Sequence, residues 1–322
     1  MLAAAAVSQS TTDPLSGLQI GEFPDPTPPA DWVIVDVVLA ALNHHDLWSL
    51  KGVGLPADRL PMILGCDAVG HDPEGNEVIV HAVVASPGWS GDETLDPRRS
   101  LLSEVHPGTL AQRVAVPRAN VIPKPAGLSW ERAVCLPTAW LTAYRMLFTN
   151  AAVQPGDTVL VQGAGGGVAT ALIQLGSAAG LRVWATSRDA AKRDLAVELG
   201  ADRAFESGAR LPDRVDAVLE TVGAATWSHS VNSLRPGGTI VISGATSGDA
   251  PAKAELTKIF FKQLRVVGST MGSRIELDRL ARFVEHTGLE PRVDCVLDLA
   301  SAREGFAKMA AGDVSGKILL RV

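Results

Sequence analysis

The sequence has 322 residues, of which 46% are hydrophobic and 20% are charged, and its formal net charge is −6 at pH 7. A chain of this length and composition has enough apolar residues for two domains of ordinary size. Lysine and arginine are scattered through an acidic chain, which excludes the basic surface typical of proteins that bind nucleic acids or anionic membranes. We therefore expect a small-molecule partner, no nucleic acid and no membrane.

The three cysteines, Cys66, Cys135 and Cys295, are too far apart for a disulfide framework or a zinc-finger pattern. They fit a reducing cytoplasm. The first residues, MLAAAAVSQSTTDP, lack a basic region, and their apolar run is too short for a signal sequence or a membrane span. The sequence therefore predicts a cytoplasmic protein.

The first 125 residues are predicted to be mainly β-structure. A β-rich run covers residues 32 to 42 after a proline-dense connector, and shorter strands are predicted at 76 to 84 and 110 to 117. Residues 85 to 108 are polar and rich in turn formers, which indicates a surface lobe.

The segment ALNHHDLWSLKG, residues 40 to 51, brings together His44, His45 and Asp46, which are common metal ligands. Adjacent residues of an extended chain point in opposite directions, so we do not expect the two histidines to bind one ion together.

The second part of the chain alternates strands with helices. Helical spacing begins near Leu128, and strands are predicted at 157 to 163, 181 to 187, 217 to 223, 237 to 244 and 264 to 270. This alternation predicts right-handed crossovers and a doubly wound parallel sheet of the α/β class. The last fifty residues repeat a helix, a strand, a helix and a closing strand.

A glycine loop, Gly163 to Ala169, follows the first of these strands and opens a helix. Glycine lets the backbone approach a pyrophosphate, whose charge is met by N–H groups at the helix N-terminus. About 20 positions later, where sites for NAD carry an acidic residue, the chain has Ser187 and Arg188, followed by Lys192. A hydroxyl and two cations favour the 2′-phosphate of NADPH. The alternative is that Arg188 and Lys192 only begin a solvated helix face.

Several separated segments resemble the medium-chain dehydrogenase/reductase family, of the zinc-independent quinone oxidoreductase type. They are ALNHHDLWSLKG, LPMILGCDAVG, PTAWLTAYRML, VLVQGAGGGVA, LETVG, VISGATSG and GKILLRV. The resemblance covers nearly the whole chain. It implies a GroES-like β-rich catalytic domain made of residues 1–125 and 271–322, a Rossmann NADP-binding domain of residues 126–270, and a nicotinamide in the cleft. It also implies a homodimer or homotetramer.

The same resemblance implies which positions surround the cofactor. Phe260 or Phe261 is a further candidate for the nicotinamide side, although a pair of this kind also suits a core. Ala169 stands where the family usually has the last glycine of its loop. The positions implied by the resemblance are Thr142, Gly165, Gly166, Gly167, Val168, Ser187, Arg188, Lys192, Val222, Gly244, Ala245 and Lys317.

Zinc-dependent members of the superfamily hold their catalytic metal with residues that correspond to Asn43, Cys66 and Thr138. Catalytic zinc needs about three nitrogen, sulfur or carboxylate protein ligands, and only Cys66 qualifies. Residues 85 to 108, where the structural zinc lobe would lie, contain no cysteine. The sequence therefore predicts no metal.

Without a Lewis acid, we expect hydride transfer from NADPH to an already polarised acceptor, a quinone or an α,β-unsaturated carbonyl. The substrate-side candidates are Asn43, His45, Asp46 and Thr138. Asn43 would donate a hydrogen bond to the acceptor oxygen or to the cofactor ribose, or would only cap its loop. Asp46 is expected to orient the loop. His45 would relay a proton, or be satisfied by nearby backbone.

Two other functions fit the same sequence. An enoyl-thioester reductase would use the same cofactor chemistry on a thioester. A non-catalytic NADP-binding sensor or scaffold would keep the fold without turnover.

Overall fold

The computed structural model describes residues 1–322, and the chain divides into two compact units. Unit 1 comprises Met1–Ala139 and Gly272–Val322, and unit 2 comprises Trp140–Met271. The first boundary falls later than the predicted residue 126, because the helix α2 (Trp130–Val134) packs against β3 (Trp32–Ala41) of unit 1. No helix is both long enough and apolar enough to cross a membrane.

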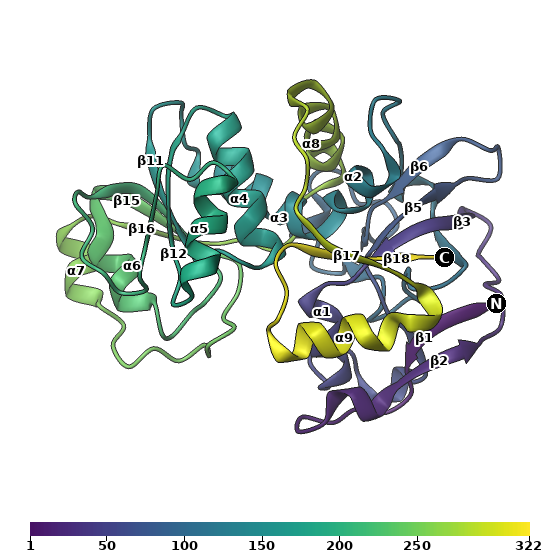
Figure 1. Cartoon of the computed structure of the whole chain (residues 1–322). Helices are drawn as coiled ribbons and strands as arrows, with labels where there is room; N and C mark the ends of the chain where they lie inside the picture. Colours follow the sequence, from purple (N-terminus) through teal and green to yellow (C-terminus); the bar gives the residue numbers. More distant parts are fainter. The chain divides into compact units, whose positions relative to one another are not determined.

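Unit 1 is built around a seven-stranded sheet with the order β10-β6-β5-β3-β18-β17, in which β9 also pairs with β3. The C-terminal strand β18 lies antiparallel to β3, with Leu319 opposite Ala41, so strands from the first and last parts of the chain share one sheet (Figure 1). Smaller sheets join β2-β1-β4 and β7-β8. The remaining strands are β1 (Leu2–Ala6), β2 (Leu18–Glu22), β4 (Met62–Ile63), β5 (Asp67–His71), β6 (Glu77–Val80), β7 (Val83–Val84), β8 (Ser100–Leu101), β9 (Arg113–Pro117), β10 (Val121–Pro123), β17 (Val293–Asp298) and β18 (Lys317–Arg321).

The helices of unit 1 include one that the sequence did not predict. Directly after β3, α1 (His44–Leu50) begins where the Asp46 carboxylate accepts the backbone N–H of Asn43, at 2.8 Å. The expectation of an extended chain or turn in this segment was wrong, because Leu47 and Leu50 supply a buried helical face. The other three α-helices of unit 1 are α2, α8 (Arg274–Thr287) and α9 (Ala302–Ala311).

Unit 2 contains a six-stranded, fully parallel sheet with the order β13-β12-β11-β14-β15-β16. This is the 3-2-1-4-5-6 order of a doubly wound dinucleotide fold, which confirms the predicted parallel sheet. Its strands are β11 (Thr158–Gln162), β12 (Arg182–Thr186), β13 (Arg203–Phe205), β14 (Val215–Glu220), β15 (Leu234–Ile242) and β16 (Arg265–Gly268), and its helices are α3 (Leu141–Tyr144), α4 (Gly167–Ala178), α5 (Ala190–Glu198), α6 (Trp227–Ser233) and α7 (Leu256–Phe261).

The order of the strands determines where a ligand site can form in unit 2. The order reverses between β11 and β14, which are the central neighbours of the sheet. Loops after these two strands diverge to opposite sides, and doubly wound sheets bind their ligands in the crevice that results. All five residues of β11 are buried, so the sheet is anchored directly beneath this point.

Candidate functional site

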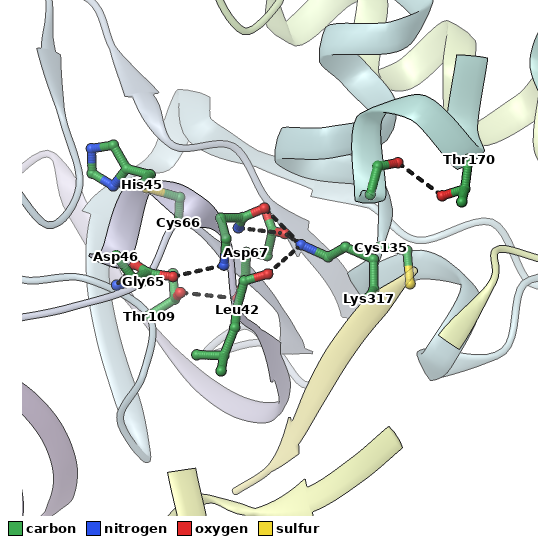
Figure 2. A network of polar contacts seen from close by, with 12 residues as sticks. Leu42, His45, Asp46, Gly65, Cys66, Asp67, Thr109, Cys135, Thr170 and Lys317 are labelled. Atoms are coloured by element: carbon green, nitrogen blue, oxygen red, sulfur yellow. Dashed lines mark hydrogen bonds and ion pairs between the residues drawn. The ribbon is translucent and has the colours of Figure 1, made fainter. Parts of the chain in front are cut away.

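A buried lysine organises the polar centre of unit 1. Lys317, at the start of β18, is only 3% exposed. Its ammonium donates to the Leu42 carbonyl oxygen at 2.8 Å, to Asn43 Oδ1 at 2.7 Å and to Asp67 Oδ2 at 2.8 Å (Figure 2). Asn43 Nδ2 donates to the same Asp67 oxygen at 2.9 Å. Because burial of an unpaired charge is costly, the opposite charges of Lys317 and Asp67 stabilise each other here.

The three residues reach this point from separate parts of the sheet. Asn43 ends the loop between β3 and α1, Asp67 begins β5, and Lys317 begins the neighbouring strand on the other side of β3. Asp67 Oδ1 is buried without a hydrogen-bond partner. The carboxylate therefore keeps one acceptor position that the protein itself does not use.

A second polar cluster surrounds His45. Its Nε2 lies 2.9 Å from Glu104 Oε1, and its Nδ1 lies 3.3 Å from Ser103 Oγ and 3.7 Å from the Cys66 sulfur. Ser103 is fully buried and holds a left-handed backbone conformation with φ of +66°. A non-glycine residue in this conformation is held there by its surroundings, which is common at functional sites.

The charges of this cluster follow from its burial. Burial alone lowers the pKa of His45, but its contacts with Cys66 and with the Glu104 carboxylate outweigh burial, and the pKa lies well above its usual value. Burial raises the pKa of the Cys66 thiol, and His45 offsets this only in part. The Glu104 carboxylate therefore favours the protonated form of His45 whatever the charge of Cys66.

The carboxylate of Asp46, next to His45 in the chain, binds two backbone N–H groups. Its two carboxylate oxygens accept the backbone N–H groups of Asn43, at 2.8 Å, and of Gly65, at 3.0 Å. Burial raises the pKa of Asp46 to about 6, although His45 and the Asn43 N–H oppose the change. The carboxylate thus ties the start of α1 to the loop before β5.

In unit 2, the glycine loop lies between β11 and α4. Gly163 has a φ of +88°, which only glycine adopts readily, and no side chain caps the N-terminus of α4. A Cβ added to Gly165 would lie 2.7 Å from Cδ of Lys192, so the aliphatic part of Lys192 lies across the loop. The free N–H groups of the helix fit a pyrophosphate, and Lys192 adds a positive charge beside them.

The turn after β12 carries the predicted ribose-phosphate residues. Arg193 Nη1 donates to the carbonyl oxygens of Ser187, at 2.8 Å, and Arg188, at 3.2 Å, and so holds the turn. The neighbouring carboxylate of Asp189 accepts backbone N–H groups at the start of α5. The only carboxylate of the turn is therefore occupied as a helix cap, while the Arg188 side chain is exposed.

A buried hydrogen-bond network joins the ends of three strands below these loops. Thr186 Oγ1 donates to Gln162 Oε1 at 2.6 Å, and Gln162 Nε2 donates to Ser230 Oγ at 2.9 Å. Ser230 Oγ donates to Glu220 Oε2 at 2.6 Å, and Glu220 Oε1 accepts the backbone N–H groups of Val222 and Gly223. The network fixes the loop after β14 relative to the turn after β12.

The predicted site residues fall into separate groups. Except for Thr142, which lies in α3, the predicted cofactor residues of unit 2 follow the carboxyl ends of strands. Lys317 belongs to unit 1, where its ammonium is engaged by Asn43 and Asp67. Thr138 lies in a π-helical turn, and its Oγ1 is buried without a hydrogen-bond partner.

Sequence reasoning missed several residues of the site. Ser103 and Glu104 lie in the segment predicted to be a surface lobe, yet Ser103 is fully buried beside His45. Asp67 follows Cys66 directly and begins the apolar strand β5. A carboxylate in such a position could have indicated a buried polar site. Glu220, in β14, gave a similar signal. No group of three or more His, Cys, Asp or Glu side chains is arranged to hold a metal ion.

Comparison with known proteins gives consistent matches over both units. A family model described as alcohol dehydrogenase GroES-like domain matches residues 29–126, and one described as zinc-binding dehydrogenase matches residues 167–286. An acryloyl-coenzyme A reductase of Sulfurisphaera tokodaii is 28% identical, over 96% of this chain and 97% of the relative. A probable quinone oxidoreductase of Schizosaccharomyces pombe is 29% identical, over 98% and 96%. The crystal structure of an NAD-dependent alcohol dehydrogenase is 34% identical, covers 100% of both chains and has a TM-score of 0.92.

Proposed function

Because the chain belongs to the medium-chain dehydrogenase/reductase family, we propose that it transfers hydride from NADPH to a quinone or an α,β-unsaturated carbonyl without a metal. The predicted fold class, a GroES-like unit and a Rossmann-type unit, is confirmed, and NAD(P)-dependent oxidoreductase activity is typical of the family. The acceptor, the choice of NADPH and the absence of a metal are the proposed parts.

The residues of unit 2 suit a dinucleotide. The uncapped N-terminus of α4 and Lys192 would hold the pyrophosphate, and the turn with Ser187 and Arg188 would hold the adenosine ribose. The preference for NADPH is supported by the occupation of Asp189 as a helix cap, since a free carboxylate there would repel a 2′-phosphate. When bound, the nicotinamide supplies the hydride.

The proposal of a metal-free reaction is carried by one observation, the position of Lys317. Asn43 stands where zinc-dependent members have a thiolate ligand, and its amide oxygen is already bound to the Lys317 ammonium at 2.7 Å. A cation at this oxygen repels a second cation. Of the three positions at which zinc-dependent members bind the metal, only Cys66 has a side chain of a type that zinc prefers, and Asn43 and Thr138 do not. The donors present do not suit catalytic zinc.

This residue set suits an acceptor whose negative charge is delocalised. When hydride reaches the β-carbon of an enone, the carbon–carbon double bond becomes an enolate, and a proton from solvent completes the saturated carbonyl. Hydrogen bonds are enough to stabilise the enolate oxygen. Oxidation of an alcohol instead passes through an alkoxide, whose localised charge a Lewis acid stabilises better. The polar groups of unit 1 supply hydrogen bonds rather than a Lewis acid.

An enoyl-thioester is the second candidate acceptor. It is favoured by the similarity to an acryloyl-coenzyme A reductase over 96% of this chain. The chemistry at the conjugated double bond is the same for thioesters and ketones, and the difference lies in what binds the rest of the substrate.

We also propose that the protein forms a homodimer or homotetramer through unit 2. The strand β16 is an edge of the parallel sheet, and Val266 on it is exposed. In the preceding helix α7, the side chains of Phe260 and Phe261 are 62% and 76% exposed. An unpaired strand beside apolar side chains is a favourable surface for a second copy.

The test is oxidation of NADPH, followed at 340 nm, with a panel of 1,4-quinones, enones and enoyl-coenzyme A thioesters. The expected result is turnover with at least one conjugated acceptor, no reduction of NADP+ when simple alcohols are supplied in the reverse assay, and unchanged rates after dialysis against a zinc chelator. Tight NADPH binding without turnover of any acceptor would favour a sensor or scaffold. Stoichiometric zinc by elemental analysis, or loss of activity on chelation, would contradict the metal-free reaction.

A further inference from the structure

The side-chain amide of Asn43 has an orientation that its neighbours determine. An ammonium only donates hydrogen bonds and a carboxylate only accepts them. Lys317 Nζ lies 2.7 Å from Oδ1, and Asp67 Oδ2 lies 2.9 Å from Nδ2. Exchanging the oxygen and nitrogen of the amide would place donor against donor and acceptor against acceptor. Asn43 therefore has a single orientation, in which its Oδ1 and one Nδ2 hydrogen are used and the other Nδ2 hydrogen has no protein acceptor.

All three ammonium hydrogens of Lys317 are used within the protein, so none remains for a ligand. Its ammonium has three hydrogens, and three acceptors surround it: the Leu42 carbonyl oxygen at 2.8 Å, Asn43 Oδ1 at 2.7 Å and Asp67 Oδ2 at 2.8 Å (Figure 2). With 3% of the residue exposed, no other position is open to it. Any effect of this cation on a bound molecule must therefore pass through a neighbouring group.

Asn43 is the neighbour that can pass this effect on. A cation bound to an amide oxygen draws electron density from the amide nitrogen, which makes the remaining N–H a stronger donor. Chains of hydrogen bonds strengthen one another in this way, and the low dielectric of a buried site increases the effect. Asp67 is fully buried and Asn43 is 8% exposed, so water screens the interaction little.

We propose that Lys317 and Asp67 are positioning residues that act through Asn43, whose remaining Nδ2 hydrogen donates to the carbonyl oxygen of the substrate. The inference rests on the proposed function. As hydride adds to the β-carbon, the double-bond electrons move to the carbonyl oxygen, and a preorganised donor stabilises the charge that develops there. Solvent then protonates the α-carbon, so NADPH and one proton are consumed for each double bond reduced.

The first experiment needs no substrate. In ¹H–¹⁵N spectra of the full chain, the side-chain amide of Asn43 is followed in the wild type and in Lys317→Met. A matched control is Lys124→Met, because the Lys124 side chain is equally buried, donates to the carbonyl oxygens of Leu128 and Pro125, and pairs with the Glu77 carboxylate. The Asn43 resonances should move in Lys317→Met and stay in place in Lys124→Met. An unmoved Asn43 amide in Lys317→Met overturns the proposed coupling.

The second experiment is a cycle of variants measured with the acceptor that the wild type reduces best. Lys317→Met alone leaves Asp67 as an unpaired buried charge, so it is combined with Asp67→Asn, which removes the charge and keeps an acceptor for Asn43. We expect this pair of substitutions to lower kcat about tenfold with KM for NADPH unchanged, and Asn43→Ala to lower kcat about 10²-fold, as for loss of one oxyanion donor.

The decisive comparison is the same pair of substitutions placed in the Asn43→Ala background. If Lys317 acts through Asn43, the pair lowers kcat no further there. An equal fold-loss of kcat in both backgrounds shows that Lys317 contributes independently and overturns the proposal. If the wild-type protein reduces none of the acceptors tested, the proposed function is refuted instead. The Asn43 amide spectra then still decide whether Lys317 polarises Asn43.

Discussion

The buried carboxylate of Asp46 makes the stability of the protein depend on pH in an unusual direction. Most paired carboxylates stabilise a fold more as pH rises, because their folded pKa is depressed. Burial of Asp46 instead raises its pKa from 3.8 to about 6. Between these two values the folded state binds more protons than the unfolded state, so the contribution of Asp46 to stability decreases as pH rises from about 4 to about 6.

The magnitude follows from the two pKa values. A difference between 3.8 and about 6 corresponds to about 3 kcal/mol, at 1.36 kcal/mol for each pKa unit. Asp46 is fully buried, so no reduction for solvent screening applies. This value is the full loss, reached between about pH 2 and pH 8, and about 2 kcal/mol of it falls between pH 4 and pH 8, because the unfolded carboxyl is already more than half ionised at pH 4.

The appropriate variant is Asp46→Asn, measured against the wild type over the same pH range. Carboxylates that do not interact with Asp46 titrate equally in both proteins, so the difference between the two free energies of unfolding reports Asp46 together with its coupling to His45 and Asp67. The variant loses one acceptor for a backbone N–H, which lowers its stability by a similar amount at every pH. Relative to the wild type, it should therefore gain about 2 kcal/mol between pH 4 and pH 8.

Urea unfolding at several pH values gives this difference directly, and ¹³C resonances of the Asp46 carboxyl give its pKa. The alternative physical outcome is that the two backbone N–H donors, from Asn43 and Gly65, outweigh burial. In that case the pKa of Asp46 is depressed and the variant loses relative stability as pH rises. A difference that is flat with pH, or that falls, refutes the reasoning from burial.

Three further outcomes are expected. Arg188→Ala should weaken NADPH binding about tenfold or more and leave NADH binding unchanged, as measured by fluorescence titration, because one charged hydrogen bond contributes about 1.5–3 kcal/mol; equal losses for both cofactors would contradict a role at the 2′-phosphate. Glu104→Gln should lower the pKa of His45 in NMR titrations, since the Glu104 contact raises it. The contribution of this contact to stability is then present below pH 6.5 and lost as pH rises through the raised pKa. Replacing both Phe260 and Phe261 by serine should shift sedimentation velocity toward monomer, and an unchanged oligomer would place the interface elsewhere.

The parts of the fold predicted from sequence are those determined by local patterns. In β3, Val35 is buried and Asp36 is exposed, and the change from an apolar to a polar side chain is enough to predict this alternation. The strand, glycine loop and helix around Gly163 depend on residues that are neighbours in the chain. In α1, by contrast, Leu47 and Leu50 have helical spacing, but we expected an extended chain without a metal site in this segment.

The polar site was less predictable because it depends on long-range pairing. Lys317 and Asn43 are separated by 274 positions, and they meet only because β18 pairs with β3. Resemblance to the family placed Lys317 near the cofactor, and nothing local distinguished that role from an ion pair with Asp67. Glu104 reaches His45 from a polar segment whose composition is typical of a surface loop, although Ser103 just before it is buried in a left-handed conformation.

The polar centre of unit 1 also bears on the choice between acceptors. A zinc ion carries two positive charges and contacts the substrate oxygen directly, whereas the single charge of Lys317 is already paired with Asp67 at 2.8 Å. What remains for a ligand is a neutral amide hydrogen on Asn43, strengthened through its oxygen. Such a donor is too weak to hold a localised alkoxide, yet it suits an enolate or a hydroquinone anion, whose charge is spread over several atoms. With Asn43 as the proposed donor to the substrate oxygen, the arrangement of Lys317, Asp67 and Asn43 would favour conjugated acceptors over alcohols.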